Sequence, residues 1–131
     1  MDVLDKYISE LEEDTKLDVF KVRDVQCMLP GIKHKWIGRL IRHKQKSQTL
    51  EQELNEKRNQ IATLLTNQAD YKLSRPMAEK AAEKHNEVVD IKNRIKDNKS
   101  VVELLEKTER VLSSMTYDIK NLVEIMKIET I

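Results

Sequence analysis

Apolar residues return at the three- and four-residue spacing of an amphipathic helix in several separate stretches of the chain. The first stretch predicts a helix from a cap at Asp2 to about Glu13. A second, shorter helix fits residues 18–29, with Asp18 as its cap and Pro30 as its stop. The apolar residues expected to pack on these two helices are Val3, Leu4, Tyr7, Ile8, Leu11, Val19, Val22, Cys27 and Met28.

A long helix is predicted from Pro30 to about Leu65, because proline is well tolerated in the first turn of a helix. Its apolar residues alternate spacings of four and three, which is the heptad pattern of helices that pack along a seam. His43, Ser47 and Lys57 interrupt this pattern, so we expect a loosely packed helix that faces a partner. The seam comprises Trp36, Leu40, His43, Ser47, Leu50, Leu54, Lys57, Ile61 and Leu64.

Two further helices are predicted in the second half of the chain. After a polar turn at residues 66–75, Ser74 and Pro76 provide a cap and a first-turn proline for a helix that reaches at least Ile95. We place a break near Asn98, and the last helix follows it. That helix is apolar over so much of its circumference that it must be covered on two sides, by its own chain and by a neighbouring subunit. The stripe assigned to oligomerisation is Leu112, Met115, Ile119, Leu122 and Met126.

Composition supports an all-α fold. The 131 residues include only two Gly and two Pro, and 36% are charged. Aromatic residues make up only 4%, which is few for a compact core, so long helices are expected to bury their stripes against one another or against a second subunit. We therefore predict one all-helical domain over residues 1–131, an elongated hairpin or bundle with a long basic helix and an apolar C-terminal oligomerisation helix.

The compartment follows from what the sequence lacks. No apolar run approaches the roughly 20 residues of a membrane span, and no signal-peptide pattern is present. The single Cys27 has no partner for an intramolecular disulfide. A cytoplasmic protein without membrane contact is expected, in the host cell if a phage encodes it.

Charge is segregated along the chain although the net charge is only +1. Residues 1–24 hold eight acidic and four basic residues, whereas residues 33–46 hold six basic residues and no acidic one. A basic helix surface attracts phosphates through counterion release, and Trp36 or Tyr71 could stack on an unpaired base. The alternative is a solvated face or an electrostatic partner for the acidic segment.

Residues able to perform chemistry are missing from the sequence. There is no Gly-rich phosphate loop, no Cys pair for zinc and no nucleophile motif. His34 and His43 are nine residues apart and do not share a helix face, and His85 is expected in a core or interface. The acidic residues Glu12, Glu13 and Asp14 are interpreted as a frayed, solvated helix end. We therefore predict no enzyme, no catalytic residue, no metal and no cofactor.

Several segments in a fixed order resemble one family. These segments are LEEDTKLD, then MLPGIKHKWIGRL with its Pro, Ile, Lys, His, Lys, Trp pattern at residues 30–36, then a long charged helix ending near Tyr71. They are followed by IKNRIKDNKSVVELLEK and by SSMTYDIKNLVEIMKIE, in which Tyr117 precedes a basic, apolar end around Lys127 and Ile128. In this order the chain resembles the UvsY-type recombination mediators of tailed phages.

The resemblance implies a function without catalysis. Mediators of this type bind single-stranded DNA coated by a single-strand-binding protein, weaken that coat, and help a RecA-like phage recombinase to nucleate its filament. They work as ring-shaped homo-oligomers, here expected to have six or seven subunits, and their C-terminal region is important for assembly.

The resemblance also indicates where DNA would bind. It places basic residues of the DNA site in the later part of the long helix, where Lys57 and Arg58 are the nearest match. The basic segment 33–46 either extends the same DNA track or meets an acidic segment of the same or a neighbouring subunit. The predicted DNA-binding residues are Lys57, Arg58, Lys33, Lys35, Trp36, Arg39, Arg42 and Lys72.

A second class of function stays open from the residues alone. The seam of the long helix also fits a structural or adaptor coiled coil that binds another protein and no nucleic acid. Salt-dependent retention on single-stranded DNA, compared with that of a charge-matched helical control, separates the two classes.

Overall fold

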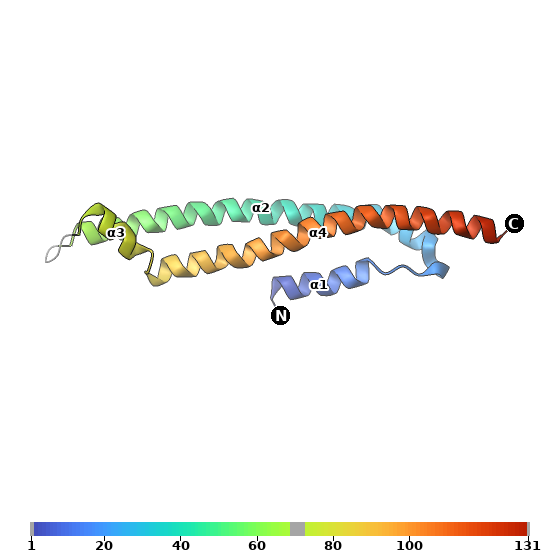
Figure 1. Ribbon diagram of the computed structural model, residues 1–131, viewed down its shortest axis with the longest axis horizontal. Coiled ribbons are helices and arrows are strands. Elements are labelled where there is room, and N and C mark those ends of the chain that lie inside the picture. Colours follow the sequence, from blue (N-terminus) through green and yellow to red (C-terminus); the bar gives the residue numbers. More distant parts are fainter. Residues whose placement is uncertain (1, 69–72, 131) are drawn as a thin grey trace. The chain divides into compact units, whose positions relative to one another are not determined.

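Every regular element of the protein is a helix in the computed structural model, which describes residues 2–68 and 73–130 (Figure 1). No strand occurs in these residues, so the predicted all-α class is confirmed. The elements are α1 (Val3–Asp14), the 3-10 turn η1 (Val19–Lys21), α2 (Val22–Thr66), α3 (Arg75–Ala82) and α4 (Asn86–Glu129).

Two aspartates start the first elements as the sequence predicts. The Asp2 carboxylate accepts a hydrogen bond of 2.8 Å from the backbone N–H of Asp5, which satisfies one free donor at the start of α1. The Asp18 carboxylate accepts a hydrogen bond of 2.9 Å from the N–H of Phe20 and caps η1 in the same way. The short helix predicted after Asp18 is not a separate element, because η1 leads directly into α2.

Pro30 lies inside α2, so the prediction that it stops one helix and starts another is wrong. Proline lacks an N–H and crowds the preceding turn, which costs about 3 kcal/mol in a helix interior. The core offsets this cost, because Val22, Leu29 and Trp36 follow one another at intervals of seven residues and are all buried. Cys27 and Met28, expected as apolar contacts, face away from this row and are exposed.

The helix breaks in the second half of the chain differ from the predicted ones. The helix expected to run through residues 74–95 is interrupted between α3 and α4, at residues 83–85, where no Gly or Pro marks an end. His85 lies in this break and is exposed, so it is not a core histidine. The predicted break at Asn98 does not exist, because α4 continues through it.

The chain divides into two packing units, residues 1–42 with 100–131, and residues 43–99. In the first unit, α1 and the C-terminal part of α4 pack on the beginning of α2. Its buried residues are Val22, Leu29, Trp36, Leu40, Val101, Leu105, Leu112, Met115 and Ile119. Helices α2 and α4 each run through both units, and the single domain over residues 1–131 stays a prediction.

The second unit joins the later part of α2 to α3 and to the beginning of α4. Ala62, Ala78 and Ala82 are fully buried at its centre, and such small side chains let helices approach closely. Larger residues close the cluster around them, namely Leu54, Ile61, Val88 and Ile91. The seam residues Leu54 and Ile61 are therefore buried as predicted, whereas Leu64 is 68% exposed.

A buried polar layer lies in the second unit where the seam has its polar residues. Asn98 is 4% exposed, and its amide donates to the backbone carbonyl of His43 at 2.9 Å and to Ser47 Oγ at 2.6 Å. Its Oδ1 lies 2.8 Å from His43 Nδ1, and a side-chain carbonyl can only accept, so His43 carries a proton on Nδ1. Asn98 therefore crosses to α2 and does not end α4.

Among the described residues, no helix is both long and apolar enough to cross a bilayer.

Candidate nucleic-acid interface

The basic beginning of α2 is in contact with the acidic helix α1. The guanidinium group of Arg39 donates to both oxygens of Glu10, from Nη1 at 2.7 Å and from Nη2 at 3.3 Å. Lys35 Nζ lies 2.6 Å from Asp14 Oδ2 and 3.5 Å from Glu10 Oε2. Two predicted DNA-binding residues are thus paired with carboxylates of the same chain, and Asp14 is not a solvated helix end.

Trp36 lies under these ion pairs and is only 2% exposed. Its indole N–H donates to Asp14 Oδ2 at 2.8 Å, and the ring of Tyr7 meets it edge to face with a centroid distance of 5.6 Å. The guanidinium of Arg39 lies over both rings, 4.6 Å from that of Tyr7 and 4.8 Å from that of Trp36. In this arrangement the indole has no open face, so the predicted stacking on a base requires α1 to move away.

Glu10 is held in its ionised form by these contacts. The hydrogen bond from Arg39 is the largest cause, and the positive charges of Arg39 and Lys35 add to it against the cost of partial burial. Together they hold the pKa of Glu10 below its ordinary value. The contact between α1 and α2 is therefore strongest when this carboxylate is charged.

Lys33 and Arg42 have different surroundings. Lys33 is half-buried and donates from Nζ to Thr116 Oγ1 on α4. Arg42 is exposed and forms no ion pair within the part of the chain that the structure describes. Of the predicted basic residues between positions 33 and 42, Arg42 has its charge most open to a ligand.

Lys57 and Arg58 belong to a second cluster of opposite charges, formed by α2, the break after α3 and the start of α4. Lys57 Nζ lies 2.9 Å from Glu87 Oε2, and Arg58 Nη2 donates to Glu83 Oε2 at 3.2 Å. Arg58 Nε is 2.6 Å from Glu83 Oε1 but makes no hydrogen bond, so this second contact is ionic only. Lys92 also donates to Glu83, which gives that carboxylate two cationic partners.

The carboxylates of this cluster are stabilised as anions. The hydrogen bond from Lys92, followed by that from Arg58, lowers the pKa of Glu83 despite some desolvation. The hydrogen bond from Lys57 lowers the pKa of Glu87. Both side chains are at least 39% exposed, so water and salt screen these interactions.

Arg75 and Lys92 are basic residues of this region that the sequence did not single out. Arg75 Nη1 donates to Thr63 Oγ1 at 3.2 Å and Nη2 to Asn59 Oδ1 at 3.3 Å, so it fastens α3 to α2. Its Nε pairs with Glu79 at 3.0 Å. Lys92 shares Glu83 with Arg58, because the break after α3 places Glu83 between α2 and α4, and no sequence signal marks that break.

The residues predicted for oligomerisation have mixed surroundings. Leu112, Met115 and Ile119 are 2%, 4% and 2% exposed, because they belong to the core of the first unit. Leu122 is partly buried, and Met126 is 36% exposed. An intersubunit role of this stripe stays a prediction, and Leu122 and Met126 are the members with surface to offer.

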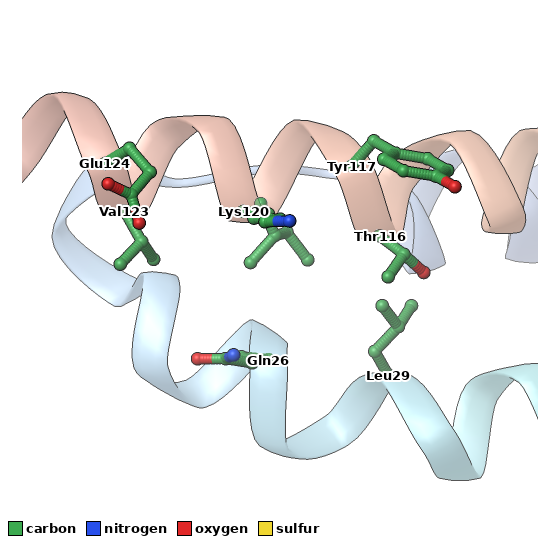
Figure 2. Close-up of a pocket in the computed structure, with 8 residues that line it drawn as sticks. Gln26, Leu29, Thr116, Tyr117, Lys120, Val123 and Glu124 are labelled. Atoms are coloured by element: carbon green, nitrogen blue, oxygen red, sulfur yellow. The ribbon is translucent and has the colours of Figure 1, made fainter.

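A groove of about 480 Å³ lies in the first unit between the start of α2 and the end of α4 (Figure 2). Gln26 and Leu29 of α2 line one wall. The other wall is formed by residues of α4, namely Thr116, Tyr117, Ile119, Lys120, Val123 and Glu124. The Thr116 hydroxyl donates to the Leu112 carbonyl at 3.3 Å and accepts from Lys33, so it is not paired with Lys120 or Glu124 as a nucleophile would be with its base. Within the described residues, no group of three His, Cys, Asp or Glu side chains could hold a metal ion.

The sequence of the chain matches the model of one protein family. A family model described as "Recombination, repair and ssDNA binding protein UvsY" matches residues 10–130. The chain belongs to the UvsY family. The match begins within α1 and ends at the end of α4, so it includes both clusters of opposite charges and confirms the resemblance seen in the sequence.

Solved structures of one UvsY protein have the same fold. The bacteriophage T4 recombination mediator protein UvsY matches in one crystal form with a TM-score of 0.83 and 12% sequence identity, over 98% of this chain and 99% of that one. A second crystal form matches with a TM-score of 0.79 and 13% identity, over 99% of both chains. Comparison with curated proteins finds no match.

The DNA-binding residues predicted from the sequence are distributed over both packing units of the fold. Lys33, Lys35, Trp36, Arg39 and Arg42 lie in the first packing unit, and Lys57 and Arg58 lie in the second. Lys72, like Tyr71, lies outside the described residues. Their contacts with DNA remain predictions.

Proposed function

We propose that this protein is a recombination mediator that binds single-stranded DNA and loads a RecA-like phage recombinase onto strands coated by a single-strand-binding protein. The match to the UvsY family over residues 10–130 carries this proposal. It is supported by the T4 protein of the same fold, which is described as a recombination mediator. The role is not enzymatic, and the protein acts by binding.

The basic residues of α2 provide the phosphate contacts in this proposal. Lys57 and Arg58 are about one-third exposed, and their carboxylate partners are more exposed still, so a phosphate can replace those carboxylates without a large structural change. Arg42 offers its charge at the surface. Assembly into a ring of six or seven copies would repeat such weak sites along one strand and raise the avidity of the whole.

The first experiment measures binding of the purified protein to a labelled single-stranded oligonucleotide by fluorescence anisotropy between 50 and 400 mM salt. We expect binding that is nearly independent of base sequence and that weakens as a linear function of log salt. A charge-matched helical protein serves as the control. Binding no tighter than that of the control would instead favour an adaptor coiled coil without nucleic-acid binding.

The second experiment measures loading. On DNA coated by the single-strand-binding protein, this protein should increase the DNA-dependent ATPase rate of the cognate recombinase, and it should hydrolyse no nucleotide alone. Intrinsic turnover that survives repurification would contradict the non-enzymatic role, and an unchanged recombinase rate would contradict the mediator role.

A further inference from the structure

Helix α1 is attached to the rest of the first unit by few contacts. None of its 12 residues is buried, and only Leu4, Tyr7 and Leu11 pack against the apolar cluster. Val3 is 46% exposed and Ile8 39%, so two of the five apolar residues of α1 remain in water. Isolated helices of about 12–15 residues are marginal in water, so α1 depends on its contacts with α2.

The polar contacts of α1 concentrate on one part of α2. Glu10 and Asp14, one turn apart on α1, hold Arg39, Lys35 and the indole N–H of Trp36. Two of these three partners are cations and the third is an aromatic ring. Cations and an aromatic ring are the groups that bind the phosphates and bases of a single strand.

We propose that α1 is an internal competitor for DNA: its Glu10 and Asp14 carboxylates occupy Lys35 and Arg39, so docked α1 and single-stranded DNA exclude each other at the beginning of α2. The inference rests on the proposed function and adds a regulation to it. When a strand binds, α1 leaves, phosphates take the place of the two carboxylates, and the uncovered face of Trp36 stacks on a base.

The geometry gives the strand a place to begin. Arg42 follows Arg39 by three residues and Lys35 by seven, so the three cations lie along one face of α2. Arg42 is exposed beyond the α1 contacts and can hold the first phosphate while α1 is still docked. The next phosphates of the same strand are then present at high local concentration beside Lys35 and Arg39.

The first test neutralises the competitor. The variant Glu10→Gln with Asp14→Asn keeps polar side chains of similar size, and its helix content is checked by circular dichroism. We expect tighter binding to an oligonucleotide of dT, with a salt slope steeper by up to about 1.4, because two freed carboxylates no longer take up cations and each phosphate contact on a single strand then contributes its full value of roughly 0.7. Over a fourfold rise in salt, this slope corresponds to an additional loss of affinity of up to about sevenfold.

The matched control is Asp5→Asn with Glu12→Gln. It removes the same two negative charges from α1, but both side chains are exposed and form no ion pair within the described residues. If both double variants gain the same affinity and slope, net charge explains the gain and the competition is overturned.

The second test uses the unaltered protein. Trp36 is the only tryptophan of the chain, so its emission reports the docking of α1 directly. At saturation with the oligonucleotide, the emission of Trp36 should change. Stacking of the indole on a base would quench it directly, and an uncovered indole without a stacked base would be quenched more strongly by acrylamide. If the emission and the acrylamide quenching are both unchanged at saturation, the competition between α1 and DNA is overturned, whatever the variants show. In that case the protein still binds the oligonucleotide, so the proposed function stands. Failure of the parent protein to bind the oligonucleotide at all overturns the proposed function instead.

Discussion

The buried layer around Asn98 allows a quantitative test of how the second packing unit is held together. Replacing Asn98 by Ala removes three hydrogen bonds of 2.6–2.9 Å, two to His43 and one to Ser47. At a net contribution of about 1 kcal/mol each, the loss is roughly 3 kcal/mol, with an added cost for polar groups left without partners. The better helix propensity of Ala returns about 0.5 kcal/mol.

Asn93→Ala is the matched control, because Asn93 lies on the same helix and is exposed. Both variants share the propensity gain, so the difference between their free energies of unfolding isolates the buried layer and should be about 3 kcal/mol. Urea unfolding followed by circular dichroism measures it, at one protein concentration because self-association would add to stability. With an m-value of about 1.5–3 kcal/mol per molar, the midpoints should differ by about 1–2 M.

A difference below about 0.5 kcal/mol would refute this reasoning, since surface substitutions alone produce changes of that size. A second comparison tests its physical basis. Asn98→Leu leaves the proton on His43 Nδ1 without its acceptor, whereas Asn98→Leu with His43→Leu removes both partners. Because removing both members of a buried polar pair can be nearly neutral, the double variant should be more stable than Asn98→Leu.

Three further predictions concern binding, assembly and pH. Replacing Lys57 and Arg58 by Ala should weaken binding to single-stranded DNA equally across base sequences and flatten the salt slope by up to about 1.4. Replacing Leu122 and Met126 by Asp should give smaller species in light scattering, because unpaired carboxylates would enter apolar surface. The pKa of Glu10 is lowered in the folded protein, so its contribution to α1 docking is complete above the ordinary value of 4.5 and is lost as pH falls through the lowered value. Quenching of Trp36 by acrylamide should therefore rise below pH 4.5, and it should rise less in Glu10→Gln.

Each of these predictions has a control and an outcome that contradicts it. Lys107→Ala with Arg110→Ala removes two exposed cations elsewhere, and an equal effect on the salt slope would mean that Lys57 and Arg58 act through net charge alone. Ser114→Asp with Asn121→Asp adds the same charge at exposed positions of α4, and equal dissociation would argue against the apolar stripe. An identical pH profile in Glu10→Gln would assign the change to another group.

The periodicity of the sequence predicted the helices well, because apolar burial depends on spacing within one element. Leu40, Leu50, Leu54 and Ile61 are all buried in the seam that their spacing defines. The breaks were predicted poorly, since they depend on what the helix packs against. Pro30 is a strong local stop signal, yet the flanking core residues hold α2 in one piece.

The roles of the buried polar residues were not predicted, because they depend on contacts between helices and not on spacing within one helix. His43 and Ser47 appeared as defects of the seam, and Asn98 as a break, because each was considered within its own helix. Their partner lies more than 50 residues away in the sequence, so only the fold shows that they complete one another. The segregation of charge did indicate that the basic segment could meet acidic residues, but it did not show that Glu10 and Asp14 would be those residues.

The two clusters of opposite charges also determine how DNA binding should respond to salt. Lys35, Arg39, Lys57 and Arg58 are each paired with a carboxylate already, so a phosphate that takes one of these cations leaves a carboxylate that must collect a cation from solution. Cation uptake at that carboxylate partly cancels the cation release from DNA. The observed salt slope should therefore be smaller than the number of basic residues in contact would give, and neutralising the carboxylate partners should steepen it. Under the proposed function, a chain with a net charge of only +1 would in this way exchange a bound strand readily, as a mediator that passes DNA to a recombinase requires.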